Sequence, residues 1–296
     1  MRRLIVNADD FGYTAGVNRA IVEAHTQGIV TSSTLMANGP AFADAARLAA
    51  TAKELSIGSH IVLIDGEPLL APHRIRTLAG RGTTSSFRDG LMSFAARAIS
   101  GMISADEIEA EAKEQIRKIQ SAGIAVSHFD THKHTHVFPK VLRPLLRAAA
   151  ACGVKAVRNP FGPRRPLRSS ELLAKPSLWK RTVEVRMLRA FAAKFQAAVD
   201  RMGFSTPDGT LGIEVTGVLD ERLFRAIAES IPEGTWEFVC HPGYNDADLQ
   251  AANTRLRQSR ELELRALTLP EARHLLTEKN IELISYREFV NAECRS

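Results

Sequence analysis

The sequence predicts an α/β fold, a deformed (β/α) barrel of the TIM type that forms a single domain over residues 1–296. Short apolar or β-branched runs, typical of buried strands, alternate along the chain with stretches of helical periodicity. About eight such units favour a barrel of parallel strands. The alternative is an open doubly wound sheet. After the first strand, however, the glycine spacing of Rossmann and P-loop folds is missing, so a nucleotide-binding fold has no local support.

The expected elements follow one another in βα order. Apolar composition places strands at residues 4–8, 30–36, 57–63, 125–130, 155–158, 211–215, 236–240 and 281–285. Helical periodicity predicts helices that include residues 16–27, 41–53, 105–122 and 139–151. Ser104 is expected to cap the third of these helices, with Glu107 completing a capping box.

The composition is that of a globular protein with a full hydrophobic core. The chain has 296 residues, of which 45% are hydrophobic and 24% charged, which excludes a disordered chain or a disulfide mini-scaffold. Three widely spaced cysteines suggest neither a disulfide framework nor a thiolate metal site. No apolar run is long enough to span a bilayer, and the apolar stretch at residues 4–6 is too short for a signal peptide. We therefore expect a cytoplasmic protein.

The positive charge is concentrated in one segment. The net charge is +6, and residues 158–201 contain eleven Lys or Arg against three Asp or Glu. Aromatic and aliphatic residues are mixed with these cations around Trp179, as in helices that lie on membrane surfaces. One hypothesis is that the segment contacts the inner face of an anionic membrane; the other is an ordinary helix with a solvated basic face. We expect no nucleic acid partner, and the oligomeric state stays open.

Reactive side chains follow four of the predicted strands. Asp9 and Asp10 end the first, His60 lies in the third, residues 128–136 hold four histidines, and His241 follows the seventh. Barrel active sites lie at the carboxyl ends of the strands, so these segments are expected to converge. Individually, the aspartates fit a turn and His60 fits a satisfied core histidine.

Together, these residue types point to metal-assisted hydrolysis. Two imidazoles and one carboxylate hold a divalent ion while leaving positions open for water and substrate. In the adjacent pair, Asp10 suits a metal ligand and Asp9 a general base, and His241 suits a general acid. If the chain stays extended after residue 128, alternate side chains up to His136 face one side, although only one or two of them are expected to reach the site. The neighbouring Cys240 is expected to be buried and inert.

Four motifs, in the same order and spacing, resemble the YdjC-like carbohydrate deacetylases. They are residues 7–12, 58–63, 128–139 and 240–242. Residues 62–68, Lys133 and residues 87–90 are most similar to the hopanoid-biosynthesis-associated (HpnK) branch of that family. The resemblance spans nearly the whole chain.

The resemblance implies a deformed barrel that removes an acetyl group from an N-acetylated sugar with one divalent metal ion, Mg²⁺ or Zn²⁺. By motif position it implies Asp10, His60 and His132 as metal ligands, Asp9 as base and His241 as acid. The expected substrate-binding residues are His134, His136, Asp130 and Arg158. The branch implies an N-acetylglucosaminyl hopanoid as substrate. The alternatives are a chitooligosaccharide deacetylase and a non-catalytic protein that binds lipid surfaces or nucleic acid.

Overall fold

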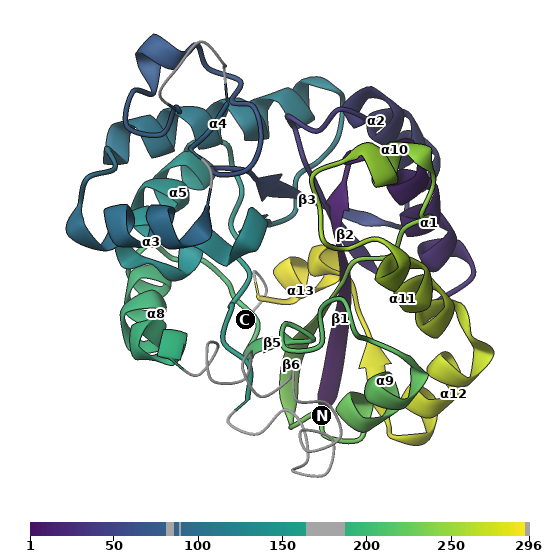
Figure 1. The fold of residues 1–296 in the computed structure, drawn as a ribbon. Coiled ribbons are helices and arrows are strands. Elements are labelled where there is room, and N and C mark those ends of the chain that lie inside the picture. Colours follow the sequence, from purple (N-terminus) through teal and green to yellow (C-terminus); the bar gives the residue numbers. More distant parts are fainter. Residues whose placement is uncertain (81–85, 89, 164–186, 294–296) are drawn as a thin grey trace.

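A curled parallel sheet forms the frame of the structure, a computed structural model that describes residues 1–80, 86–88, 90–163 and 187–293 (Figure 1). Its seven strands run in the order β4-β3-β2-β1-β6-β5, and β7 pairs with the beginning of β1. All ladders between these strands are parallel. The strands are β1 (Arg2–Phe11), β2 (Ser32–Leu35), β3 (Ser56–Ile61), β4 (Phe129–Thr131), β5 (Gly209–Leu211), β6 (Gly234–Cys240) and β7 (Ile281–Leu283).

The segment predicted as the fifth strand, residues 155–158, connects the two edges of the sheet. It makes isolated parallel bridges from Val157 to Phe129 of β4 and from Ala156 to Ser205, just before β5. Two backbone hydrogen bonds of 3.0 Å support these bridges, from Phe129 N to Ala156 O and from Val157 N to Ser205 O. The ring of backbone pairs thus closes through bridges and not through a regular strand, which confirms the predicted deformed barrel.

Helices cover the outside of this ring in two groups that pack on separate parts of the core (Figure 1). The first group is α1 (Ala15–Thr26), α2 (Phe42–Thr51), α9 (Glu221–Ala228), α10 (Ala247–Ala251), α11 (Gln258–Thr268) and α12 (Pro270–Glu278). The second is α3 (Leu91–Ser100), α4 (Ala105–Ser121), α5 (Pro139–Ala151) and α8 (Ala192–Arg201). Short 3-10 turns lie at η1 (Pro72–Arg74), η2 (His132–Val137) and η3 (Arg189–Phe191).

The two faces of strand β1 differ: one packs on the outer apolar core, and the other carries polar side chains into the interior of the ring near its carboxyl end. Leu4, Val6 and Ala8 belong to the outer core under the first helix group. The alternate residues Asn7 and Asp9 are also buried, because successive side chains in a strand point to opposite faces. The pairing with β2 shifts register between Ala8 and Phe11, and Asp10 has a φ of 67°. This irregularity brings two adjacent aspartates to the carboxyl end of the strand in different directions.

Helix α13 (Tyr286–Glu293) packs one face against the interior of the ring beside Ile5 of β1, with Tyr286 and Phe289 buried and its other face exposed. Its Tyr286 and Phe289 form a small core cluster with Ile5, Ala156 and Ile284. The Tyr286 ring stacks on the imidazole of His128, with centroids 3.5 Å apart and an interplanar angle of 11°. The space under the site is therefore packed with side chains.

Several local expectations need correction. Residues 125–128 contribute backbone hydrogen bonds but no regular ladder, so β4 begins only at Phe129. Strand β5 ends at Leu211, four residues before the predicted strand end at residue 215. The next residue, Gly212, has a φ of 96°, which is not a strand conformation. Ser104 caps α4 as predicted, but the Glu107 carboxylate accepts hydrogen bonds from Thr77 instead of completing the capping box.

The extended conformation expected for residues 128–136 is wrong beyond Thr131. Residues 132–137 form the 3-10 turn η2, in which Lys133 and His134 have φ values of 53° and 52°. The histidines of this segment consequently point in different directions and do not share one face.

The basic segment lies only partly within the described residues, because 164–186, including Trp179, fall outside them. Of its described members, Arg158 is fully buried and Phe195 is 1% exposed in the core, so neither is available to a membrane; Met187 is 73% exposed. Among the described residues, no helix has the length and apolarity needed to cross a membrane.

Candidate functional site

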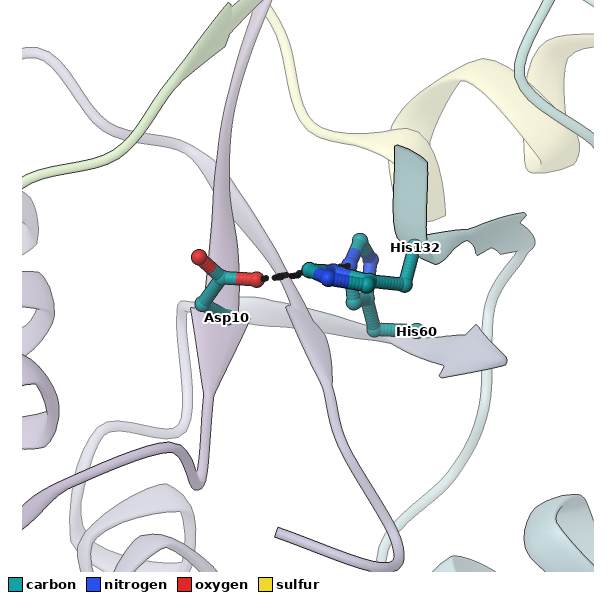
Figure 2. Close-up of side chains that lie close together, drawn as sticks. All are labelled: Asp10, His60 and His132. Carbon is teal, nitrogen blue, oxygen red and sulfur yellow. Dashed lines mark hydrogen bonds and ion pairs between the residues drawn. The ribbon is translucent and has the colours of Figure 1, made fainter. Parts of the chain in front are cut away.

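Three potential metal ligands meet at the carboxyl ends of β1, β3 and β4 (Figure 2). Asp10 Oδ1 lies 3.4 Å from His60 Nε2 and 3.5 Å from His132 Nδ1, and the two imidazole nitrogens are 3.3 Å apart. Ligand atoms about 2.1 Å from one metal ion lie roughly 3.0–3.4 Å from each other in octahedral or tetrahedral geometry. The three side chains therefore fit one divalent cation. Asp10 and His60 are buried, and His132 is partly exposed.

Asp130 orients the His60 ring. His60 Nδ1 donates a hydrogen bond of 2.7 Å to Asp130 Oδ1, so that Nε2 faces the triangle of ligands. A carboxylate bonded to the far nitrogen is the usual partner of a histidine that binds metal. Burial lowers the pKa of His60, but the carboxylates of Asp130, Asp9 and Asp10 together outweigh burial and raise the pKa to about 9. A metal ion must therefore displace a proton from this imidazole.

A fully buried arginine joins three carboxylates below the ligand triangle. The Arg158 guanidinium donates two hydrogen bonds to Asp9, at 2.6 and 2.8 Å. It also lies 2.5 Å from Asp130 Oδ2 and donates from Nε to Glu237 Oε1 at 2.8 Å. Tyr286 donates to the other oxygen of Glu237 at 2.6 Å. Each of the three carboxylates has a partner, and Arg158 supplies the positive charge that they share.

Asp9 is held as a carboxylate beside the metal ligands. Burial would raise its pKa, but Arg158 opposes burial, and His60 and His241 add to this effect, so that the pKa lies well below its usual range. His241 Nε2 is 3.9 Å from Asp9 Oδ2. A proton acceptor and a potential proton donor thus lie side by side at one edge of the triangle.

Glu263 on α11 holds the segment that carries His241. Its Oε2 accepts a hydrogen bond of 2.6 Å from the backbone N–H of His241 and lies 3.9 Å from His241 Nδ1. One turn earlier, Arg260 donates to Asp10 Oδ2 at 2.5 Å. Burial would raise the pKa of Asp10, but Arg260 together with His132 and His60 keeps it well below its usual range.

The predicted substrate-binding residues divide into two groups. Asp130, Arg158 and His136 are 0% exposed. Asp130 and Arg158 bind other site residues, and Thr131 Oγ1 lies 2.7 Å from His136 Nδ1. In this structure the three side chains contact other residues around the site, and their role in substrate binding stays a prediction. His134 stays partly exposed.

Sequence reasoning missed four contributors to the site. Arg260 and Glu263 lie in a stretch rich in charges that is typical of an exposed helix, so no local signal distinguishes them. Thr34 lies on β2 within 3.2–3.3 Å of Asp130 Oδ2 and Asp9 Oδ1. Glu237 did leave a signal, because it is a single charge inside the apolar strand predicted at residues 236–240. Cys240, by contrast, is buried as expected, and burial raises the pKa of its thiol well above the usual value.

The sequence is similar to known proteins along nearly their whole length. Curated relatives named carbohydrate deacetylase are 34% identical in Geobacillus stearothermophilus and 30% identical in Thermoanaerobacter pseudethanolicus. In both comparisons 97% of this chain and 98% of the relative are covered.

Solved structures agree with the fold. A crystal structure from Enterococcus faecalis V583, described as a "putative cellobiose-phosphate cleavage protein", is 25% identical with a TM-score of 0.77, covering 97% of this chain and 98% of the other. A lactam utilization protein from Thermus thermophilus is 14% identical with a TM-score of 0.51, covering 96% and 99%, and supports the fold alone. The YdjC-like protein family matches residues 3–278. The chain therefore belongs to the YdjC-like family.

Proposed function

We propose that the protein is a metal-dependent hydrolase that removes the acetyl group from an N-acetylated sugar. The observation that carries this proposal is the triangle of Asp10, His60 and His132 next to the pair Asp9 and His241. The names of the relatives agree with it, since they are carbohydrate deacetylases that match this chain almost end to end.

The site suits one metal ion and not two. A second group of potential ligands consists of Asp9, His60 and Asp130. The Arg158 guanidinium already binds both of these carboxylates, so a cation of the protein occupies the place that a second metal would need. The two imidazoles suit Zn²⁺, whereas the carboxylate and the positions open to water also suit Mg²⁺.

The residues around the triangle supply the proton transfers of amide hydrolysis. A divalent ion bound there would polarise the acetamide carbonyl and lower the pKa of a water molecule. Asp9, which is deprotonated, accepts the proton of the attacking water. His241 holds a proton for the departing amine, and Glu263 keeps its backbone in place. The products are acetate and a free amino sugar.

For the substrate we propose an N-acetylglucosaminyl group carried by a hopanoid. The support is the segment at residues 62–68 and Lys133, which resemble the hopanoid-associated branch. Asp65 and Lys133 form an ion pair that links this segment to η2, next to His132. Residues characteristic of the branch therefore lie close to the ligand triangle, where they can contact a substrate.

The test is acetate release by metal-reconstituted protein, with N-acetylglucosaminyl hopanoid and diacetylchitobiose offered separately. We expect turnover of the glycolipid and its loss in His132→Ala, because that variant lacks one of three ligands. His274→Ala is the matched control, since this histidine lies on α12 with an exposed side chain. Turnover of chitobiose alone would keep the chemistry and overturn the hopanoid substrate. No acetate from either substrate, despite bound metal, would overturn the deacetylase proposal.

A further inference from the structure

We propose that Arg260 is a positioning residue that restricts Asp10 to a single metal-binding oxygen. The two oxygens of the Asp10 carboxylate have different partners. Oδ2 accepts the hydrogen bond from Arg260 Nη2 at 2.5 Å, whereas Oδ1 faces His60 Nε2 at 3.4 Å and His132 Nδ1 at 3.5 Å. Only Oδ1 therefore belongs to the triangle of ligands.

The structure holds Arg260 firmly in this place. The residue is 1% exposed, its Nε donates to Leu256 O at 3.2 Å, and its guanidinium lies 5.8 Å from the centre of the Tyr13 ring. Gly243 leaves room for the aliphatic stem, because a Cβ there would lie 2.8 Å from Arg260 Cδ. Burying a charged side chain is costly, and within the described residues its one charged partner is Asp10.

This inference rests on the metal site of the proposed function, and two consequences follow from it. A carboxylate that binds through one oxygen occupies one coordination position, which keeps other positions free for water and the acetyl oxygen. The Arg260 charge also repels a cation close to it, so the parent protein binds metal less tightly than the three ligands alone would allow. Arg260 thus favours an open site over a tightly bound ion.

The experiment titrates purified metal-free protein with Co²⁺ and follows its visible absorption, which reports affinity and coordination number without substrate. In Arg260→Met both Asp10 oxygens become available and the repulsion disappears. We expect at least threefold tighter Co²⁺ binding and weaker absorption per bound ion, as a higher coordination number produces. Arg265→Met, an exposed position on the same helix, is the control and is expected to match the parent.

Gly243→Ala gives a second test in case the methionine variant does not fold. It displaces the stem of Arg260 while keeping its charge, so the absorption is expected to weaken with little gain in affinity. Unchanged spectra in both variants, or weaker binding in Arg260→Met, would overturn the role of Arg260. Failure of the parent to bind Co²⁺ would instead overturn the proposed metal site.

Discussion

Replacing Arg158 with Met is expected to lower the free energy of unfolding by at least about 3–5 kcal/mol, the usual cost of removing one partner from a buried ion pair. Here the loss leaves three buried carboxylates, of Asp9, Asp130 and Glu237, without their shared cation. A typical domain is stable by only about 5–15 kcal/mol, so the change is large. Denaturation by urea, followed by circular dichroism, measures it.

The loss in this variant is expected to grow as the pH rises from 5 to 8. In the parent, Arg158 depresses the pKa of Asp9. The contribution of this ion pair to stability is therefore complete above pH 3.8, the pKa of an aspartate in the unfolded chain, and is lost only at lower pH. In the variant, the largest opposition to burial is lost and only weaker effects such as those of His60 and His241 remain, so burial raises the pKa values of the carboxylates and stability falls with increasing pH. Arg143→Met on the exposed side of α5 is the control. A deficit below about 1 kcal/mol that does not vary with pH would contradict this account.

Asp9→Asn is expected to reduce kcat by about 10²–10⁴-fold, the usual contribution of a general base, while metal binding stays near that of the parent. The amide cannot accept a proton from water, but Asp10, His60 and His132 are unchanged. Arg158 keeps Asp130 and Glu237 as partners, so the fold is expected to persist. Steady-state acetate release at saturating metal gives kcat, and elemental analysis gives the metal content.

Asp200→Asn, an exposed position on α8, provides the matched control for this substitution. If Asp9→Asn keeps more than a tenth of the parent kcat, another group takes the proton. If the variant loses its metal together with its activity, Asp9 acts in metal binding and not as a base.

The strand ends and their chemistry could be predicted because they depend on local sequence. A run such as residues 4–8 followed by two aspartates indicates a buried strand with polar groups at its carboxyl end, and parallel strands bring such ends together. His60, in a strand two positions away in the sheet, was placed for the same reason. The structure brings Asp10 and His60 into one group with His132.

What could not be predicted depends on contacts between distant parts of the chain. Arg158 ends a predicted strand and could equally face a substrate; only the closure of the ring shows that it points inward to three carboxylates. Arg260 and Glu263 lie on a helix with abundant charge, and their partners are 250 and 22 residues away. The turn η2 depends on left-handed backbone at Lys133 and His134. Glycine is the usual sequence signal for that conformation, and neither position has one.

The position of α13, late in the sequence and packed against the interior of the ring, affects when the site can form during translation. Tyr286 binds Glu237, which binds Arg158, which in turn binds Asp9. On the ribosome, the residues of β1 emerge long before the helix that packs beside them. Until α13 has been synthesised, the nascent chain carries a polar barrel interior that lacks its packing partner. The reactive centre is therefore completed late in synthesis, after the outer helices have been translated.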